Sequence, residues 1–356
     1  MRFFVLLSVI LVTFLPGTLS SDALEGDVCR VDGAIGQCVH YRENYDYLVR
    51  MLKPFPEEED QEYLKRYICD QAKGLTCRID SVNVEGCGVQ MEERIVGGER
   101  AAIDAFPWMA LLQYLNTRRG TKRFACGGTL LNHKFVLTAA HCLVRLPAGF
   151  ELHKIRLGEW DTESEVDCED SDDADSCALP VQDFGFERLI VHENYTGKNS
   201  DRSNDIALIK LDGAVEYNAF VKPICLPEPD MKDAGKLYLG AMRAAGWGRT
   251  ETASGSRFKL TVSLEHYELG ACNVTYTTQV RSPLKETQFC ADGDPGKDTC
   301  NGDSGGPLMK RIGTAYYVVG IVSFGPQKCG SPVPAVYTRV DKFYDWISTN
   351  MVLVEL

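Results

Sequence analysis

The sequence predicts an all-β domain that ends in a helix. From residue 95 onward, short runs rich in Val, Ile, Leu and aromatic residues recur between Gly, Pro, Asn and Asp. Such runs are typical of strands in a β-sandwich or β-barrel. The strands expected are residues 106–114, 135–138, 188–192, 206–211, 316–324 and 335–340. The helical spacing of Phe343, Trp346 and Ile347 predicts a helix over residues 342–350.

Residues 1–20 have the pattern of a secretory signal peptide. Arg2 supplies a positive charge, the run from Phe3 to Leu15 is almost wholly apolar, and small residues precede a cleavage site after Ser20. An uncleaved membrane anchor is the alternative, but this run is shorter than the roughly 20 residues that a spanning helix needs. No later stretch is long and apolar enough to span a bilayer, so we expect a secreted, extracellular protein.

The net charge of -12 argues against nucleic acid as a partner, because phosphate binding needs clustered Lys and Arg. Anionic membrane surfaces are disfavoured for the same reason.

The 14 cysteines all follow residue 20, and an even number in a secreted chain indicates seven disulfides and no free thiol. Zinc is the alternative, but no C-x-x-C or paired Cys/His cluster supports it. Cysteines from Cys29 to Cys87 crowd a small module whose stability must depend on disulfides. Residues 78–94 have no clear period and are expected to be a linker.

Three segments together carry the chemistry of a nucleophilic hydrolase. Ser304 lies between glycines in residues 300–308, where a tight turn can expose its hydroxyl and free its backbone N–H groups. Serine needs a neighbouring base, and His141 follows an apolar run while Asp205 opens an apolar strand. Each residue alone has an ordinary structural interpretation, as a turn, a structural histidine or a strand cap. In the order His, Asp, Ser they match a Ser-His-Asp hydrolase.

The order and the flanking residues resemble those of the chymotrypsin/trypsin family over residues 95–350. The resemblance implies two six-stranded antiparallel β-barrels with the active site between them. His141 would be the general base and acid, Asp205 would orient it, and Ser304 would be acylated. The N–H groups of Gly302 and Ser304 would form the oxyanion hole.

The same resemblance implies a zymogen. Arg94-Ile95-Val96-Gly97-Gly98 resembles the family's activation site. Cleavage after Arg94 would free the α-amine of Ile95, which could insert and pair with Asp303, next to Ser304. An exposed linker end is the ordinary alternative.

The specificity pocket is expected to select Arg or Lys. Asp298 stands at the family's pocket-base position, six residues before Ser304, although a solvated loop Asp is the alternative. Ser323 resembles the residue that supports the catalytic Asp and lines the substrate path, and Gly325 matches a small wall residue. Ala335 stands where a second wall glycine is usual, and its methyl is expected to crowd the pocket.

The module at residues 27–77 resembles the clip domain of arthropod clip-domain serine proteases, with an unrelated cysteine-rich module as the alternative. Asn44 and Arg78 stand at the positions of the family's third and sixth cysteines, which bond to each other in the family. Their replacement would remove that one disulfide and leave no unpaired thiol. The resemblances to the trypsin and clip families imply six of the expected disulfides. The seventh, Cys168–Cys177, is expected because these two cysteines bracket the densest part of the acidic loop. The expected bridges are Cys29–Cys77, Cys38–Cys69, Cys87–Cys225, Cys126–Cys142, Cys168–Cys177, Cys272–Cys290 and Cys300–Cys329.

Two further features concern modification and metal binding. The sequons at Asn194 and Asn273 predict N-glycosylation. The acidic loop at residues 159–175 is either a solvated surface or a calcium site. By resemblance to calcium-binding trypsins, its ligands would include Glu159, Asp161 and Asp183; no cofactor is otherwise required.

The sequence is therefore identified as a clip-domain serine protease resembling subgroup B, with residues 78–94 as linker and activation segment and residues 95–356 as the protease domain. The resemblance implies action in a haemolymph cascade on prophenoloxidase, cytokine precursors of the Toll pathway or other protease zymogens. It also implies an upstream trypsin-like activator and serpin inhibitors. The alternatives are a non-catalytic clip adaptor, which typically lacks the nucleophilic Ser, and a digestive trypsin, which would need no cysteine-rich module.

Overall fold

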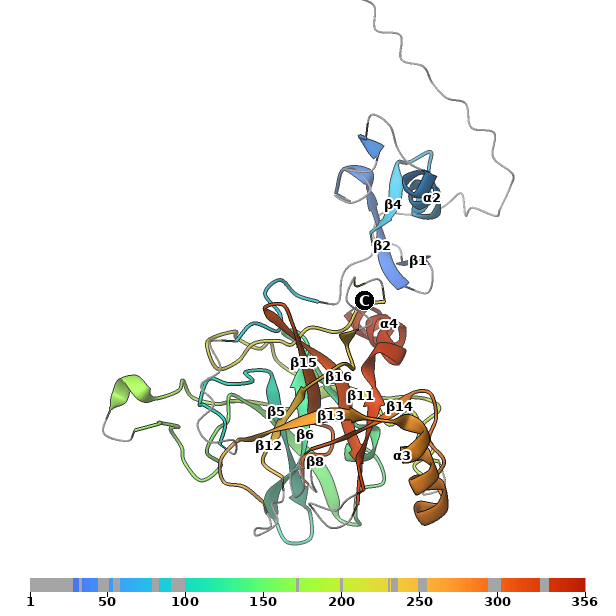
Figure 1. Cartoon of the computed structure of the whole chain (residues 1–356). Helices are drawn as coiled ribbons and strands as arrows, with labels where there is room; N and C mark the ends of the chain where they lie inside the picture. The colour runs from blue at the N-terminus through green and yellow to red at the C-terminus, as the bar shows by residue number, and fades with distance from the viewer. Residues whose placement is uncertain are drawn as a thin grey trace, which may run out of the picture. The chain divides into compact units, whose positions relative to one another are not determined.

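The computed structural model divides the chain into two compact units, Met1–Asp80 and Ser81–Leu356 (Figure 1). The residues that it describes are 28–31, 34–43, 51–53, 58–78, 83–90, 100–170, 173–198, 201–229, 231, 236–248, 255–293, 302–326 and 333–355. The expected signal peptide, residues 1–20, lies outside these ranges.

The first unit is a small antiparallel sheet with strand order β1-β2-β4-β3. Its strands are β1 (Val28–Val31), β2 (Ala34–His40), β3 (Ile68–Asp70) and β4 (Leu75–Arg78), and helix α2 (Glu58–Arg66) precedes β3. The register pairs Cys38 with Cys77, and both side chains are buried. Cys29–Cys77 and Cys38–Cys69 are bonded, so two disulfides replace much of the core that so short a chain cannot build.

The first half of the larger unit is a seven-stranded sheet of order β10-β11-β7-β6-β5-β8-β9. Its strands are β5 (Met109–Asn116), β6 (Thr121–Leu130), β7 (Phe135–Thr138), β8 (Phe150–Leu157), β9 (Gln182–Phe184), β10 (Phe186–Val191) and β11 (Ala207–Leu211). This is an open sheet, which differs from the six-stranded barrel expected.

The difference arises at Gly185, which separates the two edge strands. The β9 side of this segment pairs with β8, whereas the β10 side pairs with β11. A Cβ at Gly185 would lie 2.4 Å from Asp212 Oδ2, so a side chain there would have to displace the Asp212 carboxylate. Counted as one bent strand, β9 and β10 bring the sheet to six strands, and the sheet forms a half-barrel rather than a closed barrel.

The second half is a closed six-stranded barrel, as the resemblance implied, in the order β12-β13-β14-β17-β16-β15. Its strands are β12 (Met242–Gly246), β13 (Leu260–Tyr267), β14 (Gln288–Asp292), β15 (Pro307–Ile312), β16 (Ala315–Phe324) and β17 (Ala335–Arg339). Helices α3 (Leu269–Thr275) and α4 (Tyr344–Glu355) lie outside these strands (Figure 1). The carboxy-terminal helix is therefore present, and it extends beyond the span expected.

The main hydrophobic core joins the two halves. It contains apolar side chains from both halves, together with Ile347 and Met351 of α4. Trp108, fully buried at the start of the first half, donates its indole Nε1–H to Met309 Sδ of β15 at 2.9 Å. Because one core spans both halves, the surface between them is fixed by packing rather than by a hinge.

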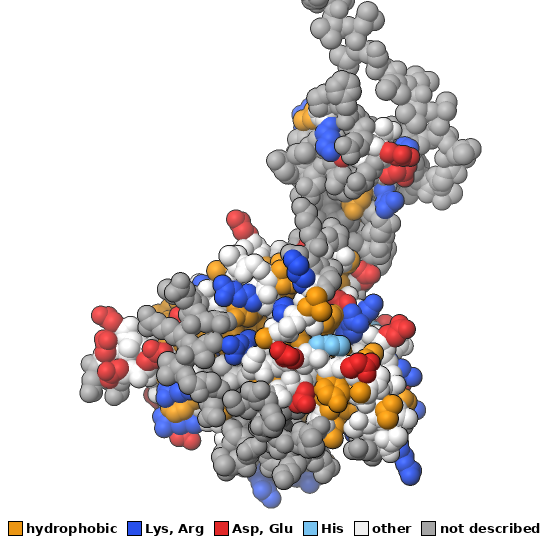
Figure 2. Space-filling view, in the orientation of Figure 1, with side chains coloured by type: hydrophobic (Ala, Val, Ile, Leu, Met, Phe, Trp, Pro, Cys, Tyr) orange, Lys and Arg blue, Asp and Glu red, His pale blue; other side chains and the backbone are white. Residues whose placement is uncertain are grey.

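The acidic loop projects from this core at the left of Figure 1. Figure 2 shows Asp and Glu side chains gathered on this projection. Glu169, Asp170, Asp173 and Asp175 of the loop are exposed. Cys168–Cys177 closes its base. Among the described residues, no helix is both long and apolar enough to cross a membrane.

Candidate active site

His141 and Asp205 are brought together by strand register. His141 lies in the short helix η2 (Ala140–Cys142), which follows β7, and Asp205 immediately precedes β11. Strands β7 and β11 are paired, with Ala207 opposite Thr138. His141 Nδ1 lies 2.8 Å from Asp205 Oδ2, and the backbone N–H of His141 donates to Oδ1 at 2.9 Å. The Asp205 carboxylate therefore orients both the imidazole ring and the backbone of His141.

The second barrel also holds Asp205. Ser323 of β16 donates its hydroxyl to Oδ2 at 2.5 Å, and Thr338 of β17 donates to the backbone carbonyl of Asp205 at 3.0 Å. Asp205 is 3% exposed. A buried carboxylate with this many donors is held in one orientation, which is what the orienting member of a triad requires.

The pKa of His141 is shifted by opposing influences. Burial lowers the pKa, but the charge of Asp205 and its hydrogen bond raise it, while the charge of Arg202 lowers it; the net direction is upward from the ordinary value of 6.5. Stabilising the imidazolium makes the ring a better acceptor for a proton from serine.

Ser304 lies on a tight turn pressed against both halves of the domain. Gly302 and Gly305 have φ angles of 110° and 80°, which favour glycine. The carbonyl of Ser304 accepts from Gly127 N at 2.8 Å, and Gly305 N donates to Val322 O at 2.8 Å. The sulfur of Cys142 lies 3.5 Å from Ser304 O and 3.7 Å from His141 Nε2, which places the serine turn beside the imidazole.

The amides of Gly302 and Ser304 are the donors that the sequence predicts for an oxyanion hole. Neither N–H has a protein acceptor among the described residues. The positive φ angles at Gly302 and Gly305 set the backbone conformation of the turn on which both amides lie. Unpaired donors beside a nucleophile are the feature that stabilises a tetrahedral oxyanion.

Asp303 is turned toward a glycine-lined recess. Its Oδ1 accepts from Gly248 N at 2.8 Å. A Cβ at Gly246 or Gly248 would lie 2.2 or 2.4 Å from its carboxylate oxygens, so both positions exclude side chains. Arg94 and Ile95 lie outside the described residues, so the pairing of the Ile95 amine with Asp303 stays a prediction.

Two of the residues expected to line the specificity pocket, Gly325 and Ala335, lie close together. Ala335 of β17 is 2% exposed, and its Cβ lies 3.5 Å from the place where a Cβ on Gly325 would stand. The methyl therefore faces the opposite wall. Asp298, at the expected pocket base, lies outside the described residues.

Six disulfides link described cysteines. They are Cys29–Cys77, Cys38–Cys69, Cys87–Cys225, Cys126–Cys142, Cys168–Cys177 and Cys272–Cys290. The pair Cys300–Cys329 lies outside the described residues. Cys126–Cys142 joins β6 to the His141 helix, so a covalent bond secures the base.

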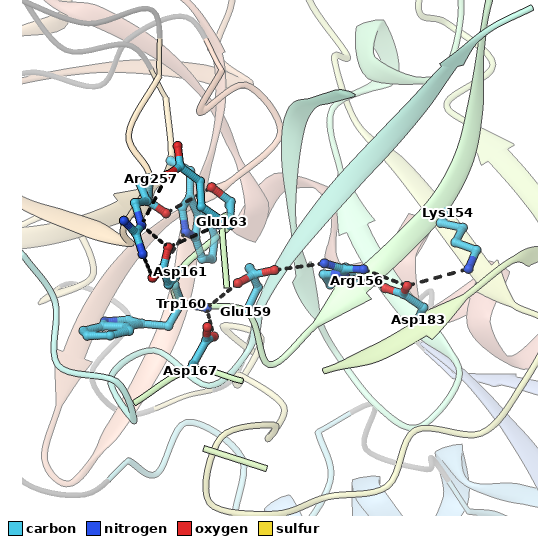
Figure 3. A network of polar contacts seen from close by, with 11 residues as sticks. Lys154, Arg156, Glu159, Trp160, Asp161, Glu163, Asp167, Asp183 and Arg257 are labelled. Atoms are coloured by element: carbon cyan, nitrogen blue, oxygen red, sulfur yellow. Dashed lines mark hydrogen bonds and ion pairs between the residues drawn. The ribbon is translucent and has the colours of Figure 1, made fainter. Parts of the chain in front are cut away.

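The three carboxylates expected to bind calcium do not share a site in the structure (Figure 3). Asp161 accepts two hydrogen bonds of 2.6 Å from Arg257, and Asp183 is held by Arg156 at 2.7 and 2.9 Å. Glu159 contacts the other side of Arg156 at 3.1 Å. Among the described residues, their oxygens do not form a group close enough for one ion.

The carboxylate that does adjoin Glu159 is Asp167, which the sequence did not single out. Both accept from the backbone N–H of Trp160, at 3.0 and 2.8 Å, and burial raises the pKa of each (Figure 3). Lys259, 3% exposed, adds a nearby positive charge, and burial lowers its pKa to about 8. Calcium binding stays a prediction, and calorimetric titration of the mature enzyme tests it.

The two sequons differ in their surroundings. Asn194 is exposed. Asn273 is half-buried in α3, and its side-chain oxygen accepts from Leu284 N at 2.8 Å. Of the two predicted glycosylation sites, Asn194 therefore has the more accessible side chain.

Comparison with known proteins agrees with this geometry. Residues 95–347 match the family model described as trypsin. The chain is 41% identical over 333 residues to the CLIP domain-containing serine protease B4 of Anopheles gambiae, with 90% of each chain covered. It is 38% identical over 307 residues to phenoloxidase-activating factor 3 of Holotrichia diomphalia, covering 83% of this chain and 85% of the relative.

A crystal structure of the Drosophila Grass clip serine protease of the Toll pathway is similar in fold. The TM-score is 0.65 at 30% identity, with 92% of this chain and 98% of that chain covered. The family model covers the whole double-barrel domain, including His141, Asp205 and Ser304, and the relatives also cover the region before it. The chain is thus a serine protease of the trypsin family, and within that family it belongs to the clip-domain serine proteases.

Proposed function

We propose that the chain is an extracellular zymogen, and that cleavage between Arg94 and Ile95 converts it into an endopeptidase that cuts after Arg or Lys in an immune cascade. The observation that carries the proposal is the contact between His141 and Asp205 beside the Ser304 turn, where the amides of Gly302 and Ser304 have no acceptor within the described ranges. These are the kinds of group that acyl transfer needs: a base with an orienting carboxylate, a nucleophile and oxyanion donors.

The catalytic roles follow from this arrangement. His141 removes the proton from Ser304 as the hydroxyl attacks the scissile carbonyl, and it then gives the proton to the leaving amine. The Asp205 carboxylate orients the ring through Nδ1 and stabilises the imidazolium. The amides of Gly302 and Ser304 bind the oxyanion of the tetrahedral intermediate.

Activation is proposed to act through Asp303. Its carboxylate already occupies the recess formed by Gly246 and Gly248, one residue from Ser304. The α-ammonium of Ile95 would pair with it, and the ion pair would hold the turn on which Gly302 and Ser304 lie.

The proposed cascade role rests on the names of the relatives, and the proposed extracellular location rests on the disulfides. One relative is named a phenoloxidase-activating factor, and the similar crystal structure is of a Toll-pathway protease. The proposed substrates are therefore prophenoloxidase, cytokine precursors or other protease zymogens, with a trypsin-like activator upstream and serpins as inhibitors. Disulfides throughout both units support an extracellular location.

The test uses the full-length precursor. Immobilised trypsin would cut it after Arg94 and then be removed, and hydrolysis of Arg, Lys and Phe peptides would be measured before and after the cut. The proposal expects hydrolysis of Arg and Lys peptides only after the cut, and none in Ser304→Ala. A fully cut wild-type protein that hydrolyses no basic peptide would overturn it.

A further inference from the structure

The turn between β5 and β6 carries a dense group of positive charges. Residues 118–123 contain four exposed basic side chains, Arg118, Arg119, Lys122 and Arg123. The chain as a whole has a net charge of -12, so the sign of this group is opposite to that of the molecule. These four residues are called the basic hairpin below.

The basic hairpin is not neutralised by any carboxylate in the part of the chain that the structure describes. On the neighbouring strand β8, Lys154 and Arg156 form ion pairs with Asp183, at 3.7 and 2.7 Å. The four side chains of the basic hairpin form no such pair with a described residue. Their charges therefore remain directed to the solvent.

The acidic loop of the same chain lies at the other end of the sheet. Strand β8 pairs with β5 so that Phe150 is opposite Asn116, next to the basic hairpin, and Leu157 is opposite Ala110. The acidic loop follows this second end, from residue 159 onward. From Phe150 to Leu157 the strand rises roughly 23 Å, which is well beyond the screening length of about 8 Å at physiological salt. The acidic loop therefore cannot neutralise the basic hairpin within one molecule.

Two guanidinium groups of the basic hairpin are packed over the start of β8. The guanidinium carbon of Arg123 lies 4.4 Å from the centroid of the Phe150 ring. The side chain of Arg118 crosses the adjacent Gly149, where a Cβ would lie 3.2 Å from Arg118 Nε. A stacked guanidinium keeps its charge and its N–H donors. The basic hairpin thus presents two partly ordered cations, which lowers the entropic cost of binding an anion.

The basic hairpin is connected to the catalytic groups through β6. Further along this strand, Gly127 N donates to Ser304 O at 2.8 Å, and from Arg123 to Gly127 the strand rises roughly 13 Å. Tyr114, which is opposite Arg123 in the register, donates its hydroxyl to Cys142 O of helix η2 at 2.8 Å. A standard protein interface covers about 800 Å² on each partner, a disc with a radius of about 16 Å. A protein seated on Ser304 therefore reaches the basic hairpin.

We propose that the basic hairpin is an exosite, a binding surface outside the catalytic centre, for an acidic segment of the protein substrate. Carboxylates of that segment form charge-assisted, bidentate hydrogen bonds with Arg118 and Arg123, and the four positive charges together speed encounter with an acidic partner. The inference rests on the proposed function, and it narrows the substrates to proteins with acidic residues near the cleaved bond.

The side of the cleaved bond follows from the catalytic roles. His141 gives its proton to the leaving amine, so the chain after the cut departs from the His141 side of Ser304. Helix η2, which contains His141, is the element that Tyr114 ties to the strand face of Arg123. Roughly 13 Å of extended chain is about four residues. The acidic residues are therefore expected from about the fourth position after the cut.

The test compares two peptide substrates that share Arg at the cleaved bond. Their fourth to seventh residues after the cut are Glu in one peptide and Gln in the other. The quantity measured is the ratio of kcat/KM for the Glu peptide to that for the Gln peptide, with the cut enzyme quantified by active-site titration. The wild-type ratio is expected to be about tenfold, and high salt should reduce it, because exposed charges are screened.

The variants separate charge from packing. Arg118→Gln/Arg123→Gln should bring the ratio near one, whereas Arg118→Lys/Arg123→Lys, which keeps both charges but loses the bidentate donors, should keep part of it. The matched control is Arg188→Gln/Lys342→Gln, which removes two exposed positive charges from β10 and from the short helix before α4. This control has the same net charge as the first variant and should keep the wild-type ratio.

The outcomes distinguish this inference from the proposed function. If the cut wild-type enzyme hydrolyses neither peptide, the proposed function fails. If it hydrolyses both with a ratio near one, or if Arg118→Gln/Arg123→Gln keeps the wild-type ratio, the exosite is refuted, and binding of a heparin fragment by the same residues would then assign them to a sulfated glycan. Should the Gln variant fail to fold, a wild-type ratio that does not change with salt would equally refute the exosite.

Discussion

His141 is half-buried beside a carboxylate, and these two conditions act on its pKa in opposite directions. Burial favours the neutral ring, but Asp205 outweighs it and raises the pKa. Catalysis needs the neutral imidazole, so kcat/KM should fall as pH falls through this raised pKa. We expect the midpoint of the acid limb above about 6.5, the ordinary value for histidine.

Asp205→Asn removes the charge that raises this pKa. We expect kcat to drop about 10⁴-fold and the acid limb of the residual activity to move to lower pH. The measurement is a pH profile of kcat/KM on an Arg peptide. Asp345→Asn, on an exposed position of α4, is the control and should leave the profile unchanged. An acid limb that stays in place in Asp205→Asn would contradict this account of the triad.

Substitution of Ala335 tests whether this single side chain limits the expected specificity pocket. Its Cβ faces Gly325 across a gap that a methyl already narrows. Replacing it with glycine should change the ratio of kcat/KM for Arg and Lys peptides by about threefold or more, because the longer and bulkier guanidinium is more sensitive to lost space than an ammonium. Unchanged rates on both peptides would show that the methyl does not limit the pocket.

Two strands that are buried on both faces were predicted from their apolar runs, although the equally buried β12 and β14 were not. Residues 135–138 and 207–211 are almost wholly buried, and their apolar runs matched β7 and β11. Strand β13 was missed because four of its eight residues are exposed and polar side chains alternate along it. A half-exposed antiparallel strand has no continuous apolar run to detect.

The start of the protease domain depends on contacts that no sequence pattern reveals. Arg100 pairs with Leu260 in a β-bridge, and its guanidinium carbon lies 4.0 Å from the Trp160 ring centroid and 3.5 Å from that of Phe258. Trp160 Nε1 donates to Ala101 O at 2.8 Å. These three segments, far apart in sequence, hold the first described residues after the activation site against the acidic loop.

We expect Arg100→Ala to lower the free energy of unfolding by about 1 kcal/mol, because two cation–π contacts are lost. Urea unfolding of the full-length precursor measures this. Arg100→Lys should retain part of the stability, and Arg123→Ala, which loses one cation–π contact, should cost less. A loss no larger in Arg100→Ala than in Arg123→Ala would contradict the role given to the two rings.

At the scale of the whole molecule, the linker is bound to the protease domain by more than one bond. Besides Cys87–Cys225, the side chain of Asn83 donates to Leu226 O at 2.9 Å and accepts from Leu226 N at 2.6 Å. Gly88 packs so closely on Tyr316 that a Cβ would lie 2.2 Å from its carbonyl oxygen. The amino-terminal chain should therefore remain attached after activation.

The double variant Cys87→Ser/Cys225→Ser tests this attachment. After cleavage at Arg94, we expect its two chains to elute together in gel filtration under native conditions. Adding Asn83→Ala removes the Leu226 hydrogen bonds and should weaken the association about tenfold or more. Complete separation of the chains in the double variant would show that the disulfide alone holds them.

The candidate site was only partly predictable from the sequence, because some of its contacts join residues that are far apart along the chain. His141, Asp205 and Ser304 stand in short motifs, because nucleophilic catalysis needs those residue types locally. Thr338 acts through a contact set by barrel register, because it reaches Asp205 across 133 positions. Asp183 and Asp161, two of the carboxylates expected to bind calcium, form ion pairs with Arg156 and Arg257. Sequence order contains no signal for such pairings.

The central claim is that cleavage at Arg94 switches on nucleophilic chemistry at Ser304. The most direct measurement is labelling with a fluorophosphonate, which reacts with activated serine, followed by mass spectrometry of the labelled peptide. The account predicts one label per molecule, on Ser304, in the cut protein, far slower labelling of the intact precursor, and none in His141→Ala. Equal labelling before and after complete cleavage, or no labelling of the cut protein, would contradict it.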